Sequence, residues 1–111
     1  MNWILLTDEQ QLNEIKKQSF NSPQVIFKHS TRCATSSMAK NRLERSQAPE
    51  GLPFYLLDLI KFRTISTKIA QEYHVHHESP QVLVIADGEC IYDESHSGID
   101  MSDIVNNAKA A

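Results

Sequence analysis

Glycine, proline and cysteine are all scarce in this chain of 111 residues, which has three glycines, four prolines and two cysteines. No repeat and no low-complexity linker interrupts it. Two cysteines do not make the framework of a disulfide-stapled secreted domain, so free thiols are expected. Hydrophobic residues make up 41% of the chain, which is enough for a core. We therefore expect a single domain over residues 1–111.

Long apolar runs and an excess of positive charge are absent as well. No run approaches the ~18 apolar residues that cross a membrane, and the opening MNWILL lacks the positive region and the cleavage site of a signal peptide. The formal net charge is −3, and the lysines and arginines are scattered rather than gathered in a stripe. We expect a soluble, cytoplasmic protein whose partners include neither nucleic acid nor a membrane.

Short apolar runs and one turn signal predict five strands. The first four are WILL (3–6), QVIF (24–27), FYLLDL (54–59) and QVLVIA (81–86). Asp87-Gly88 is a typical hairpin turn and leads to the fifth, ECIYDE (89–94). The unbroken apolar character of the third predicts a strand that is buried on both faces.

Helical spacing and breakers predict four helices between and after these strands. They are expected over about 8–19, with Thr7 and Gln10 as a capping box, over 33–46, around Ile65 to Tyr73, and after Gly98. The residues expected to face inward are Leu12, Ile15, Ser19, Phe20, Met38, Ala39, Leu43, Ile65, Ile69, Tyr73, Ile104, Val105 and Ala108. This order predicts an α/β fold with a mixed five-stranded sheet and helices on both faces, which is the thioredoxin-like arrangement.

Cys33 lies where a predicted strand gives way to a predicted helix, in KHSTRCATSSMAK (28–40). There its sulfur is expected to face unpaired N–H groups, those of Thr35 and Ser36, and the positive end of the helix dipole, which favour a thiolate. Ser36 stands where a dithiol oxidoreductase carries its second cysteine. Cys33 would then form mixed disulfides that only an external thiol resolves. The alternative is a small buried apolar residue.

Pro80 precedes the fourth strand in HESPQVLV. Thioredoxin-like folds, which the order of elements resembles, place a cis proline beside the active cysteine, and the backbone of the preceding residue, here Ser79, meets the substrate. We therefore expect a cis Ser79-Pro80 bond. The alternative is a trans proline that merely starts a strand.

Several basic side chains lie near these two motifs. Arg32 is next to Cys33 and is expected to hold its thiolate or to contact an anionic thiol substrate; the alternative is an exposed arginine with no role. His74, His76 and His77 are read as a solvated loop, because neither cysteine has a second cysteine nearby to complete a zinc site. We expect no metal site and no cofactor.

The motifs FKHSTRC, SSMA and HESPQ resemble those of the YtxJ family of monothiol bacilliredoxins, which are thioredoxin-fold proteins of the bacillithiol system. The resemblance spans nearly the whole chain. It implies that His29 and His77 line the thiol cleft. One departure is Ala34, where the family usually has proline directly after the cysteine. The substrate-binding residues expected from all these signals are Arg32, Thr35, Ser36, Ser79, Pro80, His29 and His77.

The function expected from these signals is that of a monothiol thiol-disulfide oxidoreductase with Cys33 as the catalytic residue. By resemblance its partners are bacillithiolated client proteins and a low-molecular-weight thiol, bacillithiol. A thioredoxin-like binding module and an iron-sulfur carrier of the C-x-x-S glutaredoxin type are the alternatives. A phosphatase loop is excluded, because no arginine stands six positions after Cys33. Cys90, on the expected edge strand, is not expected to resolve the mixed disulfide.

Overall fold

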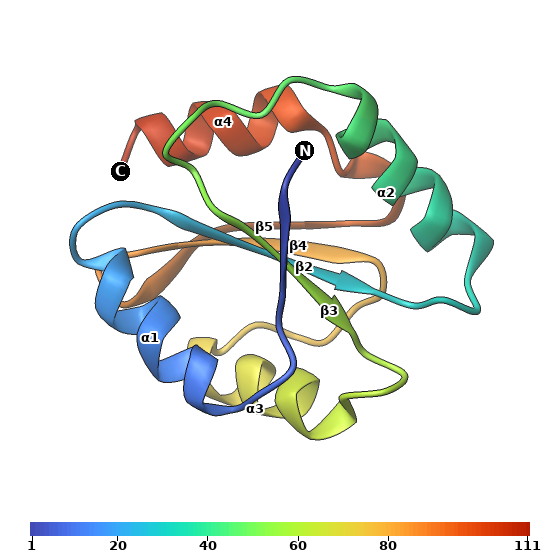
Figure 1. Ribbon diagram of the computed structural model, residues 1–111, viewed down its shortest axis with the longest axis horizontal. Helices are drawn as coiled ribbons and strands as arrows, with labels where there is room; N and C mark the ends of the chain where they lie inside the picture. Colours follow the sequence, from blue (N-terminus) through green and yellow to red (C-terminus); the bar gives the residue numbers. More distant parts are fainter.

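A five-stranded mixed sheet forms the centre of the computed structural model, which describes residues 1–111 (Figure 1). The strands lie in the order β1-β3-β2-β4-β5. β1, β3 and β2 run parallel, whereas β4 is antiparallel to β2 and β5 to β4. Their bounds are Trp3–Leu5 for β1, Gln24–His29 for β2, Phe54–Asp58 for β3, Gln81–Ala86 for β4 and Glu89–Ser95 for β5. The predicted fold class and strand order in the sequence are confirmed.

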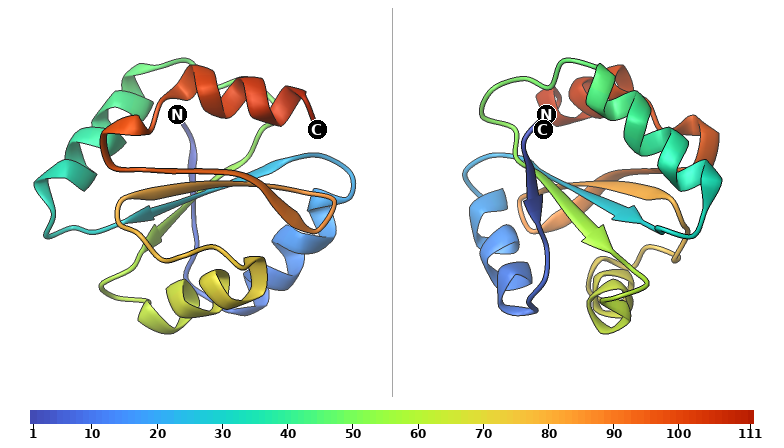
Figure 2. Two further views of the ribbon diagram at one scale, coloured as in Figure 1. Left: turned by 180° about the vertical axis from the view of Figure 1, so that it is seen from behind. Right: turned by 45° about the vertical axis from the view of Figure 1, so that its right-hand side comes forward.

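Four helices cover the two faces of this sheet. α2 and α4 pack on one face and α1 and α3 on the other (Figures 1 and 2). Their bounds are Gln10–Ser19 for α1, Ala34–Arg45 for α2, Arg63–Tyr73 for α3 and Met101–Lys109 for α4, with a short 3-10 turn η1 at His96–Gly98. No helix is long and apolar enough to cross a membrane.

The sheet separates the core into two clusters, and its central strand β2 contributes to both. All six of its residues are buried. Val25 and Phe27 belong to the cluster under α2 and α4, whereas Ile26 belongs to the cluster under α1 and α3. Because side chains alternate along a strand, Lys28 points to the same face as Ile26, into the core beneath α3. β3 is less buried than predicted, because Tyr55 and Leu56 keep part of their surface exposed.

The hairpin between β4 and β5 forms at the predicted residues. Asp87 has φ 51° and Gly88 has φ 76°, so both central residues are left-handed, as in a type I′ turn. The aromatic ring of Phe20 lies over Gly88, where an added Cβ would come within 2.7 Å of Cζ. Glycine is therefore required at position 88 both by its backbone conformation and by this close approach.

Three local predictions are wrong. The first helix has no Thr7 and Gln10 capping box; it starts after Glu9, and the Gln11 side chain instead accepts the Thr7 N–H at 2.8 Å. Phe20 lies just beyond the end of α1 and is 60% exposed. Met38 is 62% exposed, because it precedes the buried Ala39 by one residue and so projects about 100° away from it around the helix. The other predicted inward-facing residues are buried or partly buried.

Candidate functional site

Cys33 is the residue that caps the N-terminus of α2. Its backbone is extended, at φ −114° and ψ 119°, and its carbonyl accepts the Ser37 N–H at 3.1 Å. The side chain makes no capping hydrogen bond, so the sulfur does not bond the Thr35 and Ser36 amides as expected. Cys33 is the N-cap residue and directly precedes Ala34, the first residue of α2. Its side chain is partly exposed and the thiol is free.

Ser36 fixes the loop that carries Cys33. Its fully buried hydroxyl lies 2.6 Å from His29 Nδ1 and accepts the Ser30 N–H at 3.0 Å. The hydroxyl therefore joins the end of β2 to the first turn of α2. With no exposed surface, Ser36 is placed to position the loop and has no face for a substrate. Arg32 and Thr35 are exposed on either side of Cys33, and the Arg32 N–H donates to Ser30 Oγ at 3.4 Å.

His29 is a buried member of this hydrogen-bonded group. Its ring stacks on Phe27, with centroids 6.0 Å apart. Burial lowers the pKa of His29, and the positive charge of Lys40 lowers it further. A neutral ring with its proton on Nε2 then accepts the Ser36 O–H at Nδ1. His29 supports the loop from beneath.

The Ser79-Pro80 peptide bond is cis, as predicted. Pro80 is buried and directly precedes β4. Gln81 pairs with Lys28 in the antiparallel register of β2 and β4. The preceding residue, Pro80, therefore lies opposite His29, the residue after Lys28. The loop that carries Cys33 and the loop that carries Pro80 therefore leave the sheet at the same edge. Ser79 Oγ is buried there and has no hydrogen-bond partner.

Cys90 lies far from Cys33, at the opposite end of the sheet. Cys90 pairs with Ile85, which pairs with Gln24 at the start of β2. Cys33 follows the other end of β2, so the two cysteines are separated by the length of that strand, roughly 17 Å, and by two strand spacings. The position of Cys90 on the second strand from β2 would by itself separate the cysteines by only about 10 Å, so the length of β2 accounts for most of the distance. Burial raises the pKa of the Cys90 thiol to about 11, and its Sγ donates to the Tyr92 carbonyl at 3.3 Å.

The sequence model of the family described as monothiol bacilliredoxin BrxC matches residues 4–104. The chain belongs to this family. The family and the thioredoxin fold together show that this bacilliredoxin-family protein is a thiol oxidoreductase.

Solved structures share the fold. One described as having a thioredoxin fold is 26% identical with a TM-score of 0.82, over 94% of this chain and 91% of that one. The thioredoxin of Trypanosoma brucei brucei is 12% identical with a TM-score of 0.76, over 99% of this chain and 93% of that one. Mitochondrial thioredoxin 3 of Saccharomyces cerevisiae is 22% identical with a TM-score of 0.72, over 98% and 95% of the two chains. The predicted family and thioredoxin-like fold are confirmed.

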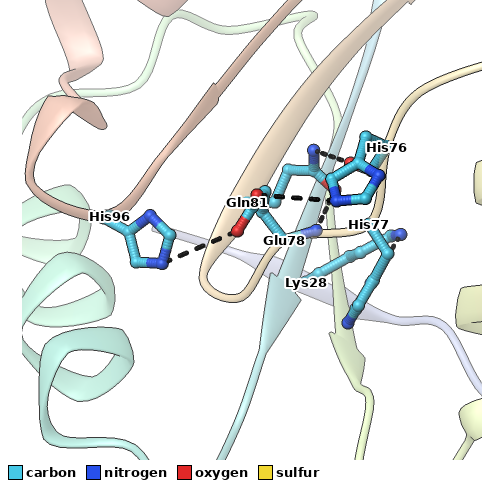
Figure 3. A network of polar contacts seen from close by, with 6 residues as sticks. All are labelled: Lys28, His76, His77, Glu78, Gln81 and His96. Atoms are coloured by element: carbon cyan, nitrogen blue, oxygen red, sulfur yellow. Dashed lines mark hydrogen bonds and ion pairs between the residues drawn. The ribbon is translucent and has the colours of Figure 1, made fainter.

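Sequence reasoning missed Lys28, one residue before His29. Its side chain is fully buried on the α3 face of β2. Its Nζ donates to the Ser66 carbonyl at 3.3 Å and lies 3.3 Å from His77 Nδ1 (Figure 3). The available signal was a lysine directly after the apolar run Val25 to Phe27 of a central strand, because a lysine is almost never fully buried without a partner.

The histidine segment is split by these contacts. His77 turns toward Lys28, while His76 lies 3.9 Å from the Glu78 carboxylate, which is also 3.9 Å from His96 (Figure 3). His74 ends α3 in a left-handed conformation, at φ 54°. No group of three or more His, Cys, Asp and Glu side chains is arranged to hold a metal ion.

Proposed function

We propose that this protein uses Cys33 to remove a low-molecular-weight thiol, such as bacillithiol, from mixed disulfides with client proteins in the cytoplasm. The observation that carries the proposal is the setting of Cys33: a free, partly exposed thiol at the N-terminus of α2, remote from the only other thiol. Family membership supports the same reaction, since the family is one of monothiol bacilliredoxins.

The reaction proceeds by two thiol-disulfide exchanges. The Cys33 thiolate attacks the sulfur of the small thiol, a new S–S bond forms, and the client leaves as a thiolate that takes up a proton. Cys33 then carries the small thiol as a mixed disulfide. A second small thiol, as its thiolate, attacks the carried sulfur, releases a symmetrical small disulfide and regenerates Cys33. Each step exchanges one S–S bond for another, so the small thiol is the net reductant.

Residues around Cys33 take different roles in this scheme. The positive end of the α2 helix dipole, next to Cys33, favours negative charge on the sulfur as it attacks and leaves. Arg32 and Thr35 are exposed beside the sulfur and are assigned to substrate contact. Ser79 and Pro80 supply backbone at the same sheet edge for the client segment. Ser36 and His29 are positioning residues, because they are buried and hold the loop.

Intact mass spectrometry tests the proposal. Reduced protein is incubated with oxidised bacillithiol, and separately with oxidised glutathione, and the mass gained is measured. We expect one bacillithiol adduct on Cys33 that fresh bacillithiol removes, and no adduct in Cys33→Ser. If oxidised glutathione reacted at the same rate, bacillithiol would not be the preferred thiol. The absence of any adduct would refute the reaction itself.

A further inference from the structure

Lys28 places a positive charge in the core without a counter-ion. Its side chain has no exposed surface, and no carboxylate lies within ion-pair distance of Nζ; its two polar neighbours are the Ser66 carbonyl and the His77 ring. A buried charge without a partner costs free energy, and burial accordingly lowers the pKa of Lys28 to about 8. A side chain this costly, with one of its three N–H donors left over, calls for a function beyond packing.

The same contact sets the state of the His77 ring. An ammonium group only donates, so charged Lys28 requires His77 Nδ1 to be the acceptor, and the ring proton then lies on Nε2. Partial burial and the nearby Lys28 charge both lower the pKa of His77. The Nδ1 contact with Lys28 is partly buried, but the residue as a whole keeps much of its surface exposed, so near neutral pH His77 presents an N–H donor at the surface, backed by a buried positive charge.

A cavity of about 400 Å³ adjoins this pair, between α3 and the segment 75–77. Ser66 and His77, the two neighbours of Lys28 Nζ, both line it. None of its lining residues is acidic, and the nearby Glu78 faces His76 and His96. The polar side chains that line it are Arg63, Ser66, Thr67, Gln71, His76 and His77. Donors and positive charge therefore dominate the cavity, which is the chemistry that binds an anion.

The cavity and the reactive thiol lie at the same edge of the sheet. Lys28, whose two polar neighbours line the cavity, and Cys33 are five residues apart in the sequence, so their Cα atoms are at most about 18 Å apart. His77 lies three residues before Pro80, in the loop that enters β4 at the edge where the Cys33 loop leaves β2. The cavity is thus on the α3 side of the edge at which a disulfide would meet Cys33.

We propose that Lys28, His77, Ser66 and Arg63 form an anion subsite that binds a carboxylate of the low-molecular-weight thiol while its sulfur reacts at Cys33. The inference rests on the proposed function and adds to it the residues that select a small thiol by a carboxylate remote from its sulfur. Arg63 contributes from the exposed first turn of α3, His77 through Nε2–H, and Lys28 through its charge from behind.

Direct binding is the first test. Malate, a small dicarboxylate, is titrated into the Cys33→Ser protein while NMR follows the His77 ring and the Arg63 side chain. We expect saturable shifts at both, an affinity about tenfold lower in Lys28→Met and in Arg63→Gln, and no change in Lys17→Met, which removes an exposed lysine from α1. Absence of saturable shifts, or equal affinity in all variants, would overturn the subsite. Arg63→Gln alters only the surface, so it decides the matter if Lys28→Met does not fold.

The second test separates the subsite from the reaction. Cys33 adduct formation is timed with oxidised bacillithiol, which carries carboxylates, and with neutral 2-hydroxyethyl disulfide. We expect the ratio of the two rates to fall about tenfold in Arg63→Gln and in Lys28→Met and to stay constant in Lys17→Met. A constant ratio in every variant would refute the substrate assignment while leaving the reaction intact, whereas no adduct from either disulfide would refute the proposed function.

Discussion

Replacing Lys28 with methionine keeps most of the length of the buried side chain and removes its charge. The pKa of Lys28 is lowered from 10.5 to about 8 in the fold, and each unit corresponds to about 1.4 kcal/mol, so the difference between the folded and unfolded pKa amounts to about 3 kcal/mol. Between pH 8 and 10.5 the unfolded chain holds the Lys28 proton and the folded chain does not. The parent protein therefore gains stability as pH rises through this window, and below pH 8 it bears the full cost of the buried charge.

Lys28→Met lacks this dependence on pH. The unfolding free energies of both proteins are measured by urea denaturation from about pH 7 to 10.5. The unfolding free energy of the parent, relative to that of Lys28→Met, should rise by about 3 kcal/mol over this range. Tyr73 and Cys90, whose pKa values are raised to about 12 and about 11, are present in both proteins and largely cancel in the comparison. Lys17→Met, the exposed control, should differ from the parent by a nearly constant amount. A constant difference for Lys28→Met as well would show that Lys28 is not buried as a charge.

Three further outcomes follow from the contacts. Ser36→Ala should lower the unfolding free energy by about 1–3 kcal/mol, because two buried polar groups lose their partner. The variant should nevertheless retain most of the rate of adduct formation. Inactivity equal to that of Cys33→Ser would contradict the positioning role of Ser36. Iodoacetamide at pH 8 should alkylate Cys33 and spare Cys90, whose pKa is raised to about 11, as peptide mass mapping would show; equal labelling would count against this. Gly88→Ala should destabilise the fold by about 1–2 kcal/mol in thermal or urea unfolding, since φ is positive and Phe20 lies over the site; an unchanged stability would contradict this view of the turn.

Sequence periodicity predicted the order of helices and strands because each element buries a regular face. β4 is apolar after Gln81 and is buried throughout, and Asp87-Gly88 specifies its hairpin through left-handed backbone angles. Periodicity failed at helix ends and flanks. Phe20 lies past the last turn of α1, and Met38 is one residue away from the buried stripe of α2. A helical pattern alone does not say where the helix stops or which residue borders its inner face.

In the candidate site, too, some features could be predicted from the sequence and others depend on how the elements pack. Cys33 and Pro80 were predicted because each marks a strand end with a distinctive residue, and the cis bond before Pro80 is observed. The hydrogen bond between Ser36 and His29 joins residues from different elements and depends on the path of the loop between them. Lys28 meets Ser66 and His77 only after β2 and α3 pack together. The distance from Cys33 to Cys90 likewise depends on strand register, which the sequence does not specify.

Intact mass spectrometry of a complete cycle tests the central claim, that Cys33 acts alone and an external thiol resolves its mixed disulfide. The parent and Cys90→Ser are each loaded with bacillithiol, stripped of free thiol, held, and then given fresh bacillithiol. The account predicts the same single adduct in both proteins, stable while no thiol is present and released at the same rate once thiol is added. Spontaneous loss of the adduct from the parent, with a gain of an internal disulfide between Cys33 and Cys90, would contradict it.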